Sequence, residues 1–139
     1  MIVLDTNVIS EIFRSQPDAR VVAWLESLVD DVAITAITLA ELLSGVRRLP
    51  EGRRKTELAG AIDAALQPYR NTRSLLPFDD DAAQAYADVL VAREYAGLPI
   101  GMADAQIAAI CRVNRATCAT RNVKDFEETG IEMVNPWSA

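Results

Sequence analysis

The residues best suited to chemistry in this chain are oxygen donors: Asp5, Glu41, Asp104 and Asn122. Each follows an apolar run within two residues or lies in the first turn of a helical stretch, so all four belong to the ends of elements. Carboxylates gathered in one place repel one another unless a cation neutralises them, and a hard divalent ion with oxygen ligands is the ordinary partner. The set therefore predicts a site for Mg²⁺, with Mn²⁺ as its substitute.

Each acidic position also has a structural interpretation. Asp5 follows a short apolar run, where it either faces a ligand at the carboxyl end of a strand or caps the next helix. Glu41 lies three residues after Thr38, which fits a capping box in which the glutamate reaches back to the N-cap amide. Asp104 stands among small residues in the first turn of a helix, where it would also complement the helix dipole.

The fourth position ends another apolar run. Thr120 and Asn122 follow this run, and Asp125 begins a short helix or turn. These side chains could simply form turn hydrogen bonds. The carboxyl ends of parallel strands meet at one edge of a sheet, however, so the joint placement of all these residues favours a common site.

The chain contains no histidine, which excludes whole classes of catalyst. Ser-His-Asp and Cys-His nucleophiles, histidine general acid/base ribonucleases and histidine-containing zinc sites are all ruled out. The two cysteines, Cys111 and Cys118, lie in apolar surroundings and are expected to be reduced and buried. An enzyme built from this sequence must rely on carboxylates and a hard metal.

The elements that must position these residues alternate along the chain. Short apolar runs predict strands at 2–4, 32–34, 75–78, 116–120 and 131–134. Helical stretches are expected at 18–29, 38–48, 52–70, 80–97 and 102–114. This alternation predicts an α/β fold, a three-layer α/β/α domain over residues 1–139 with a central parallel sheet of about five strands.

The N-terminal stretch is not expected to be a signal peptide or membrane span. Asp5, Asn7 and Glu11 interrupt its apolar residues, and no basic segment precedes them. We therefore expect a cytoplasmic protein with no membrane association.

The charge is unevenly distributed. The formal net charge is −6, whereas residues 44–73 contain seven basic and three acidic residues, a local excess of +4. A net acidic protein has no general attraction for nucleic acid, so polyanion binding would need this basic stretch or bound cations. The alternative for the stretch alone is a solvated helical face.

Taken together, the motifs resemble those of PIN-domain ribonucleases, most closely the VapC toxins of type II toxin–antitoxin systems in their FitB-like subgroup. The resemblance runs through the whole chain in the order Asp5-Thr6-Asn7, Thr38-x-Ala40-Glu41-Leu42, Ala103-Asp104, Thr120-Arg121-Asn122 and Asn135-Pro136-Trp137. It implies a toxin that is a Mg²⁺- or Mn²⁺-dependent endoribonuclease.

The resemblance also assigns roles. Asp5, Glu41 and Asp104 match three acidic catalytic positions of the family, and the fourth acid falls on Asn122, an amide that weakens the case for a second metal. Asp125 could substitute for it. The expected chemistry has one ion held by Asp5 and Asp104, with Glu41 as a further ligand or as the group that positions the attacking water. Attack by water would leave 5′-phosphate and 3′-hydroxyl ends.

The resemblance further implies partners. These are an RNA substrate, a second copy of the chain in a homodimer, and a cognate VapB-type antitoxin with which it forms a higher assembly. The basic stretch 44–73, with Arg112, Arg115 and Arg121, is the expected RNA contact set. The helices near 8–13 and 37–49 are the expected grooves for an antitoxin helix.

Three other interpretations remain. A receiver-like signalling module would need an acidic pair near the first strand and a phosphoacceptor after the third. A phosphohydrolase with a nucleophilic aspartate would need Asp-x-Asp, but the chain has Asp5-Thr6-Asn7. A non-catalytic RNA- or partner-binding PIN domain, weakened at Asn122, keeps the fold and lacks the activity.

Overall fold

The computed structural model describes residues 1–139 and contains a five-stranded sheet in the order β3-β2-β1-β4-β5. All four neighbouring pairs are parallel. The strands are β1 (Ile2–Leu4), β2 (Val32–Thr35), β3 (Leu75–Leu76), β4 (Thr117–Ala119) and β5 (Met133–Val134). The predicted parallel sheet of about five strands is confirmed.

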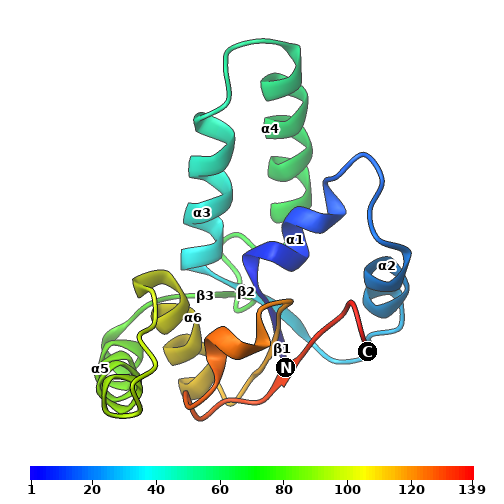
Figure 1. Ribbon diagram of the computed structural model, residues 1–139. Coiled ribbons are helices and arrows are strands. Elements are labelled where there is room, and N and C mark those ends of the chain that lie inside the picture. The colour runs from blue at the N-terminus through cyan, green and yellow to red at the C-terminus, as the bar shows by residue number, and fades with distance from the viewer.

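Six α-helices and one 3-10 helix connect the strands. They are α1 (Thr6–Ile12), α2 (Ala19–Glu26), α3 (Ala36–Arg47), α4 (Arg53–Leu66), α5 (Asp80–Tyr95), α6 (Met102–Val113) and the 3-10 helix η1 (Val123–Phe126). Figure 1 shows that α3 and α4 form a hairpin that projects away from the sheet, while α5 and α6 lie together on one side of it. None of the helices combines the length and apolar character needed to cross a membrane.

The sheet separates two apolar cores because side chains alternate between its faces. Val3 pairs in register with Ala33 and Cys118, and all three belong to the core under α5 and α6. Leu4 pairs with Ala119, and both belong to the opposite core with residues of α1 to α4. The expected three-layer α/β/α arrangement is therefore confirmed.

Several predicted boundaries are wrong, two of them because of proline. The helix expected at 52–70 ends at Leu66, since Pro68 has no N–H to continue it. The strand expected at 75–78 ends at Leu76 because Pro77 cannot donate to the ladder. The helix expected at 18–29 ends at Glu26, and the last two strands are shorter than the runs 116–120 and 131–134.

The sheet order places a crossover between β1 and β4. The chain moves from β1 to β2 and β3 on one side, then returns to β4 on the other side of β1. Ligands of open α/β sheets bind outside the carboxyl ends of strands at such a reversal. Asp5 and Thr120 are the first residues beyond β1 and β4, so the fold puts both at this position.

Candidate functional site

Asp5 is the most deeply buried carboxylate of the candidate site, with 5% of its surface exposed. Its Oδ1 accepts a hydrogen bond from the Thr6 backbone N–H at 2.8 Å, and its Oδ2 accepts one from the Thr120 hydroxyl at 2.8 Å. Asp5 therefore caps α1, and it also lies at the carboxyl end of β1, where the sequence predicts a ligand site. Burial raises the pKa of Asp5, opposed by these two hydrogen bonds.

Thr120 connects Asp5 to the segment that follows β4. Its hydroxyl donates to Asp5 and accepts from the Asn122 backbone N–H at 3.0 Å and from the Asn7 side-chain amide at 3.3 Å. A hydroxyl has one proton and two lone pairs, so these three contacts use its full capacity. Thr120 is completely buried, and it fixes the position of Asn122 relative to Asp5.

The side chain of Glu41 is held by a residue of α1, Thr6, and not by the N-terminal backbone of its own helix. The Thr6 hydroxyl donates to Glu41 Oε1 at 2.7 Å and lies 3.1 Å from the Thr38 hydroxyl. The capping box predicted for Thr38 and Glu41 is wrong, because α3 begins two residues earlier and Thr35 is its N-cap. Thr35 Oγ1 accepts from the Thr38 backbone N–H at 3.0 Å, which leaves the Glu41 carboxylate free to face α1.

Asp104 lies in the first turn of α6, half-buried beside the other acids. Burial, and after it the negative charges of Asp5, Asp125 and Glu41, together raise the pKa of Asp104 to about 6. Only Arg93 opposes this shift. Such mutual influence indicates that these four acidic side chains, which come from different elements, lie in the same region of the molecule.

Asn122 is exposed, lies three residues beyond the end of β4 and directly precedes η1, which carries Asp125. The backbone carbonyl of Asn122 accepts from the Asp125 backbone N–H at 3.0 Å, so the turn after Asn122 brings Asp125 back toward the site. The negative charge of Asp125 contributes to the raised pKa values of both Asp5 and Asp104. An acid is therefore present near the position where the sequence has an amide.

The donor set suits a hydrated hard cation. All of its candidate ligands are oxygen atoms, and none of the four ion pairs in the molecule neutralises Asp5, Glu41 or Asp104. No three acidic side chains converge closely enough to enclose an ion by themselves. Mg²⁺ fits this arrangement, since it usually keeps several waters and takes only one or two carboxylates from a protein.

A groove of about 870 Å³ opens beside the acids, between α1, α3 and α4. Thr6 and Glu41 form its polar end, next to the candidate site. Its apolar lining consists of Phe13, Leu42, Val46, Leu58, Ala61 and Ile62. The expected groove near residues 8–13 and 37–49 is present, and α4 supplies a further wall that the sequence did not reveal.

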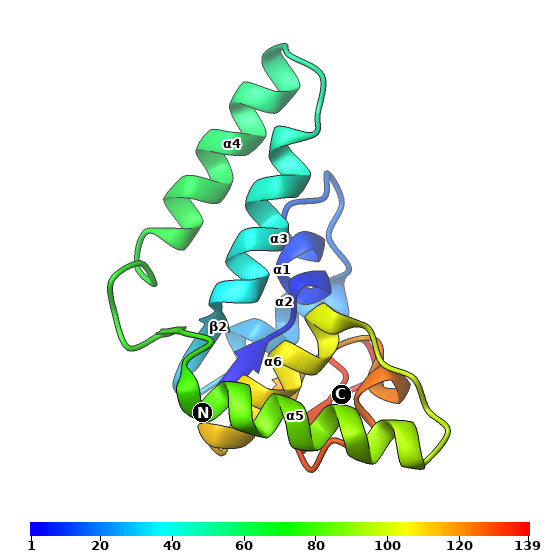
Figure 2. The same cartoon turned by 90° about the vertical axis from the view of Figure 1, so that its left-hand side faces the viewer.

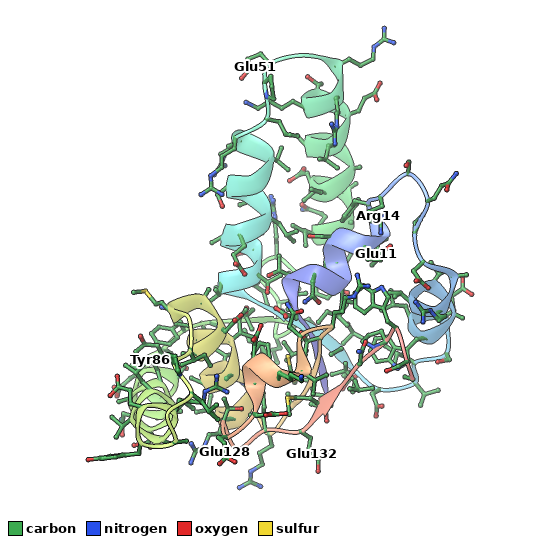
Figure 3. All side chains as sticks on the ribbon, in the orientation of Figure 1. Glu11, Arg14, Glu51, Tyr86, Glu128 and Glu132 are labelled. Carbon is green, nitrogen blue, oxygen red and sulfur yellow. The ribbon has the colours of Figure 1, made fainter.

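One end of the groove is shaped by a buried carboxylate at the end of α1. Glu11 is 4% exposed, and it accepts from the Asp18 backbone N–H at 2.9 Å and from Arg14 at 3.1 Å. These contacts, the first of them the larger, lower the pKa of Glu11. Figure 3 shows Glu11 and Arg14 at the end of α1, where Arg14 and Ser15 line the groove. Glu11 thus fixes the loop between α1 and α2.

The basic residues divide into two groups. The α3–α4 hairpin carries Arg47, Arg48, Arg53, Arg54 and Lys55, and Arg54 lines the groove. Figure 3 places Glu51 at the tip of the hairpin, where it pairs with Lys55 at 2.7 Å.

The remaining arginines of the expected RNA contact set do not all reach the site. Arg121 adjoins Asn122 and stacks over the Trp137 ring, with 5.0 Å from its guanidinium carbon to the ring centroid. Arg112 and Arg115 instead flank a separate pocket of about 230 Å³ beside Thr117. Thr117 starts β4, so Arg112 and Arg115 lie at the sheet edge opposite the site, and the structure does not group them with the acids.

Two supporting residues were missed by the sequence analysis. Thr6 holds Glu41, and Asn7 contacts both the Thr120 hydroxyl and, at 3.3 Å, the Arg121 backbone N–H. Both directly follow Asp5 at the end of β1. A polar run of three residues after a buried strand is the signal that could have identified them.

Comparison with known proteins gives full-length matches. The family model described as PIN domain matches residues 2–132. VapC ribonuclease Y4jK of Sinorhizobium fredii is 40% identical over 138 residues, which cover 99% of this chain and 98% of that protein. Toxin FitB of Neisseria gonorrhoeae is 43% identical over 138 residues, which cover 99% of this chain and 99% of that protein.

Solved structures agree with this result. The crystal structure of FitAcB from Neisseria gonorrhoeae matches with a TM-score of 0.93 and 41% identity over 100% of both chains. Other matched structures are a toxin–antitoxin complex from Klebsiella pneumoniae and VapBC2 from Rickettsia felis bound to a DNA fragment from their promoter.

Proposed function

The chain belongs to the PIN-domain family, in its branch of VapC-type toxins, and from this premise we propose a Mg²⁺- or Mn²⁺-dependent endoribonuclease. It is the toxin of a type II toxin–antitoxin system and acts on RNA in the cytoplasm. The observation that supports this most strongly is the group of acids at the crossover of β1 and β4, which no basic side chain pairs with.

Asp5 and Asp104 are the proposed metal ligands, with Glu41 as a further ligand, directly or through water. When bound, the ion would supply positive charge to the scissile phosphate and lower the pKa of an attacking water. Thr120 and the Thr6 backbone N–H keep the Asp5 carboxylate oriented before any ion arrives. The other half of the chemistry is proton transfer, and Glu41 is the exposed carboxylate available for it.

Thr6 prepares Glu41 for this role. Its hydroxyl holds Glu41 Oε1, so one carboxylate oxygen is fixed and no hydrogen bond within the protein engages the other. That second oxygen can position a water molecule or accept its proton. Asn122, adjacent to Asp5 through Thr120, offers an amide oxygen for a water or an ion, and Asp125 supplies charge nearby.

The groove beside the acids is the proposed site for the cognate VapB-type antitoxin. Its apolar walls suit the nonpolar face of a helix or an extended segment. A basic antitoxin side chain could continue past Glu41 and pair with the acids where the cation would bind, which would block catalysis. We also expect a homodimer, as the resemblance to VapC toxins implies, and a larger assembly of this dimer with the antitoxin.

The basic side chains of the α3–α4 hairpin, together with Arg121, are the proposed contacts for RNA phosphates. Arg54 of the hairpin lines the groove beside the acids, and residues outside the basic stretch 44–73 carry the net negative charge. Such contacts position the RNA backbone and give affinity that falls as salt increases.

A cleavage assay tests the activity. The purified protein is incubated with structured RNA and Mg²⁺ or Mn²⁺, with EDTA and the variant Asp5→Asn as controls. Cleavage is expected only for the wild type with metal, and the products should have 5′-phosphate and 3′-hydroxyl ends. Cleavage that persists with EDTA or in Asp5→Asn would contradict metal–carboxylate catalysis, and 2′,3′-cyclic phosphate ends would contradict attack by water.

One observation favours a second candidate function. Asn122 lacks the charge of the acid that the family pattern places there, so a PIN domain that binds RNA or a partner without cleaving it is the alternative. The same assay separates the two, since RNA that is bound but not cut in the presence of Mn²⁺ supports the alternative. A short reading frame for a DNA-binding antitoxin beside the gene would support the toxin assignment in either case.

A further inference from the structure

Arg93 is a buried cation that the proposed chemistry does not use. It lies near the end of α5, is 4% exposed, and belongs to none of the four ion pairs of the molecule. An arginine without a carboxylate partner is rarely so buried, because removing its charge from water is costly. Its hydrogen bonds must therefore explain why the fold retains it.

All three guanidinium nitrogens of Arg93 donate to backbone carbonyls. Nε donates to Leu98 at 2.7 Å and Nη2 to Pro99 at 3.3 Å, both in the loop between α5 and α6. Nη1 donates at 2.5 Å to the backbone carbonyl of Glu127, the residue directly after η1. One side chain thus joins two segments that lie far apart in the sequence.

These two segments carry acids of the candidate site. The loop through Leu98 and Pro99 leads into α6, where Asp104 occupies the first turn. Glu127 follows directly after η1, which contains Asp125 and comes after Asn122. Figure 2 shows the α5–α6 loop beside η1, on the side of the molecule away from the α3–α4 hairpin.

The end of α5 is shaped to present the carbonyls to Arg93. Gly97 adopts a φ of +70°, and the Leu98 backbone N–H returns to the Arg93 carbonyl at 2.9 Å. This left-handed turn after a helix is one that glycine adopts without strain. It directs the loop back across the guanidinium, so the backbone and side chain of Arg93 hold the same loop.

We propose that Arg93 is a positioning residue that clamps the start of α6 to η1 and thereby sets the spacing of Asp104 relative to Asn122 and Asp125. The proposal deepens the proposed function and depends on it for the consequence for metal binding. Residues behind the ligands of a metal site commonly change affinity about 10–100-fold when they are replaced. The positive charge of Arg93 also acts on Asp104 in the direction that favours its ionised form.

The test compares three full-length variants. Arg93→Met removes the charge and all donors, whereas Arg93→Lys keeps the charge but has only one nitrogen. Val89→Ala is the matched control, because Val89 lies one turn away on α5, is completely buried, and loses core packing without touching the clamp. Mn²⁺ affinity is measured by titration, and amide hydrogen exchange is measured in EDTA at a temperature where all variants are folded.

For Arg93→Met we expect Mn²⁺ binding at least about 10-fold weaker than in the wild type. Amide exchange should become faster in residues 98–105 and 123–129 together. Arg93→Lys should fall between the wild type and Arg93→Met, and Val89→Ala should match the wild type in Mn²⁺ affinity and in exchange of both segments.

Unchanged exchange in both segments of Arg93→Met would overturn the clamp, with or without metal. Wild-type exchange in Arg93→Lys would show that charge, not the three donors, is what matters, and would also overturn it. A wild type that binds no Mn²⁺ would refute the proposed metal site and with it the effect of Arg93 on metal binding. Faster exchange in Arg93→Met would in that case still support the clamp between the two segments.

Discussion

At the scale of single residues, the candidate site is a set of carboxylates that are oriented in advance by hydroxyl groups. Thr120 holds Asp5, and Thr6 holds Glu41, each through a hydrogen bond shorter than 3 Å. Threonine suits this purpose, since its hydroxyl donates to a carboxylate without neutralising the charge that a cation would need. Asp104 has no such donor, and burial near other acids makes its ionised form unfavourable.

Asp104 predicts how the stability of the metal-free protein depends on pH. The folded pKa of about 6 lies above the ordinary value of 3.8, so ionised Asp104 destabilises the fold above pH 6, and this penalty disappears as the pH falls toward 4. Asp104→Asn should therefore be more stable than the wild type at pH 7.5 in EDTA, and the advantage should shrink at pH 5.

Urea denaturation at the two pH values measures this difference. Asp88→Asn, at an exposed position of α5, is the control for removing a negative charge and should show no such dependence on pH. An advantage of Asp104→Asn that is the same at pH 5 and pH 7.5 would contradict the interpretation of its environment.

Thr120 predicts a loss of stability when its hydroxyl is removed. Thr120→Val keeps the shape but leaves the buried Oδ2 of Asp5 without its donor and removes the acceptor of the Asn122 N–H. We expect the free energy of unfolding to fall by about 1–3 kcal/mol. Thr120→Ser keeps the hydroxyl and loses one methyl group, so it should cost less, about 1 kcal/mol. Denaturation showing Thr120→Val as stable as the wild type would refute the role of this hydrogen bond.

At the scale of elements, the α3–α4 hairpin is what extends the candidate site into a groove. Without α4 the acids would lie at an open sheet edge, whereas Leu58, Ala61 and Ile62 provide a second wall opposite α1. Gly45 of α3 also lines this groove, and an added Cβ there would meet nothing within 4 Å. A side chain introduced at Gly45 would therefore enter the groove without a clash at its Cβ.

Gly45→Leu predicts a selective loss of antitoxin binding. The new side chain would occupy the groove, while replacing a glycine within a helix should raise stability by about 0.5–1 kcal/mol. Gly60→Leu is the matched control, because Gly60 lies within α4, also has open space at its Cβ, and does not line the groove. Calorimetry with the cognate antitoxin should show binding at least about 10-fold weaker for Gly45→Leu only. Equal affinities for both variants would place the antitoxin elsewhere.

The hairpin arginines predict where RNA binds. Arg53→Glu with Arg54→Glu should weaken RNA binding markedly, most of all at low salt, since phosphate contacts release counterions. Arg112→Glu with Arg115→Glu makes the same change of charge at the opposite edge of the sheet and should have a much smaller effect. Binding is measured by fluorescence anisotropy in the Asp5→Asn background to prevent cleavage. Equal losses in both double variants would indicate a nonspecific effect of net charge.

The elements were predictable from sequence to the extent that apolar runs and helical spacing define them. The runs at 2–4 and 32–34 identify the central strands because both faces of these strands are buried. The start of α3 was missed, since Thr35 and Thr38 are equally good caps by sequence and only the end of β2 decides between them. The contacts of Arg93 could not be predicted from sequence, because all of its acceptors are backbone carbonyls and every residue has one.

At the scale of the whole molecule, the sheet order is what converts separate acids into one site. Asp5, Glu41, Asp104 and Asp125 come from four different segments, and the crossover beside β1 brings them to a single edge. The sequence pointed to this edge correctly because strand ends share it in any parallel sheet. It did not reveal that Arg112 and Arg115 lie at the opposite edge, since charge along a chain does not show which edge of the sheet a residue occupies.

The net charge of −6 also has a local explanation at this scale. Part of the acidic excess comes from the carboxylates of the site itself. The basic residues of the hairpin lie beside the groove, so the proposed RNA contacts and the acidic site occupy separate regions of the molecule. A cation bound among the acids would allow RNA to reach both regions, because it would neutralise the negative charge that repels an RNA phosphate.

The central claim is that these acids bind a divalent cation, and anomalous diffraction from crystals soaked in Mn²⁺ tests it most directly. We predict a manganese peak bounded by the carboxylates of Asp5 and Asp104, absent in Asp5→Asn crystals treated in the same way. A map with no peak at the crossover, or a peak there that persists unchanged in Asp5→Asn, would contradict the claim.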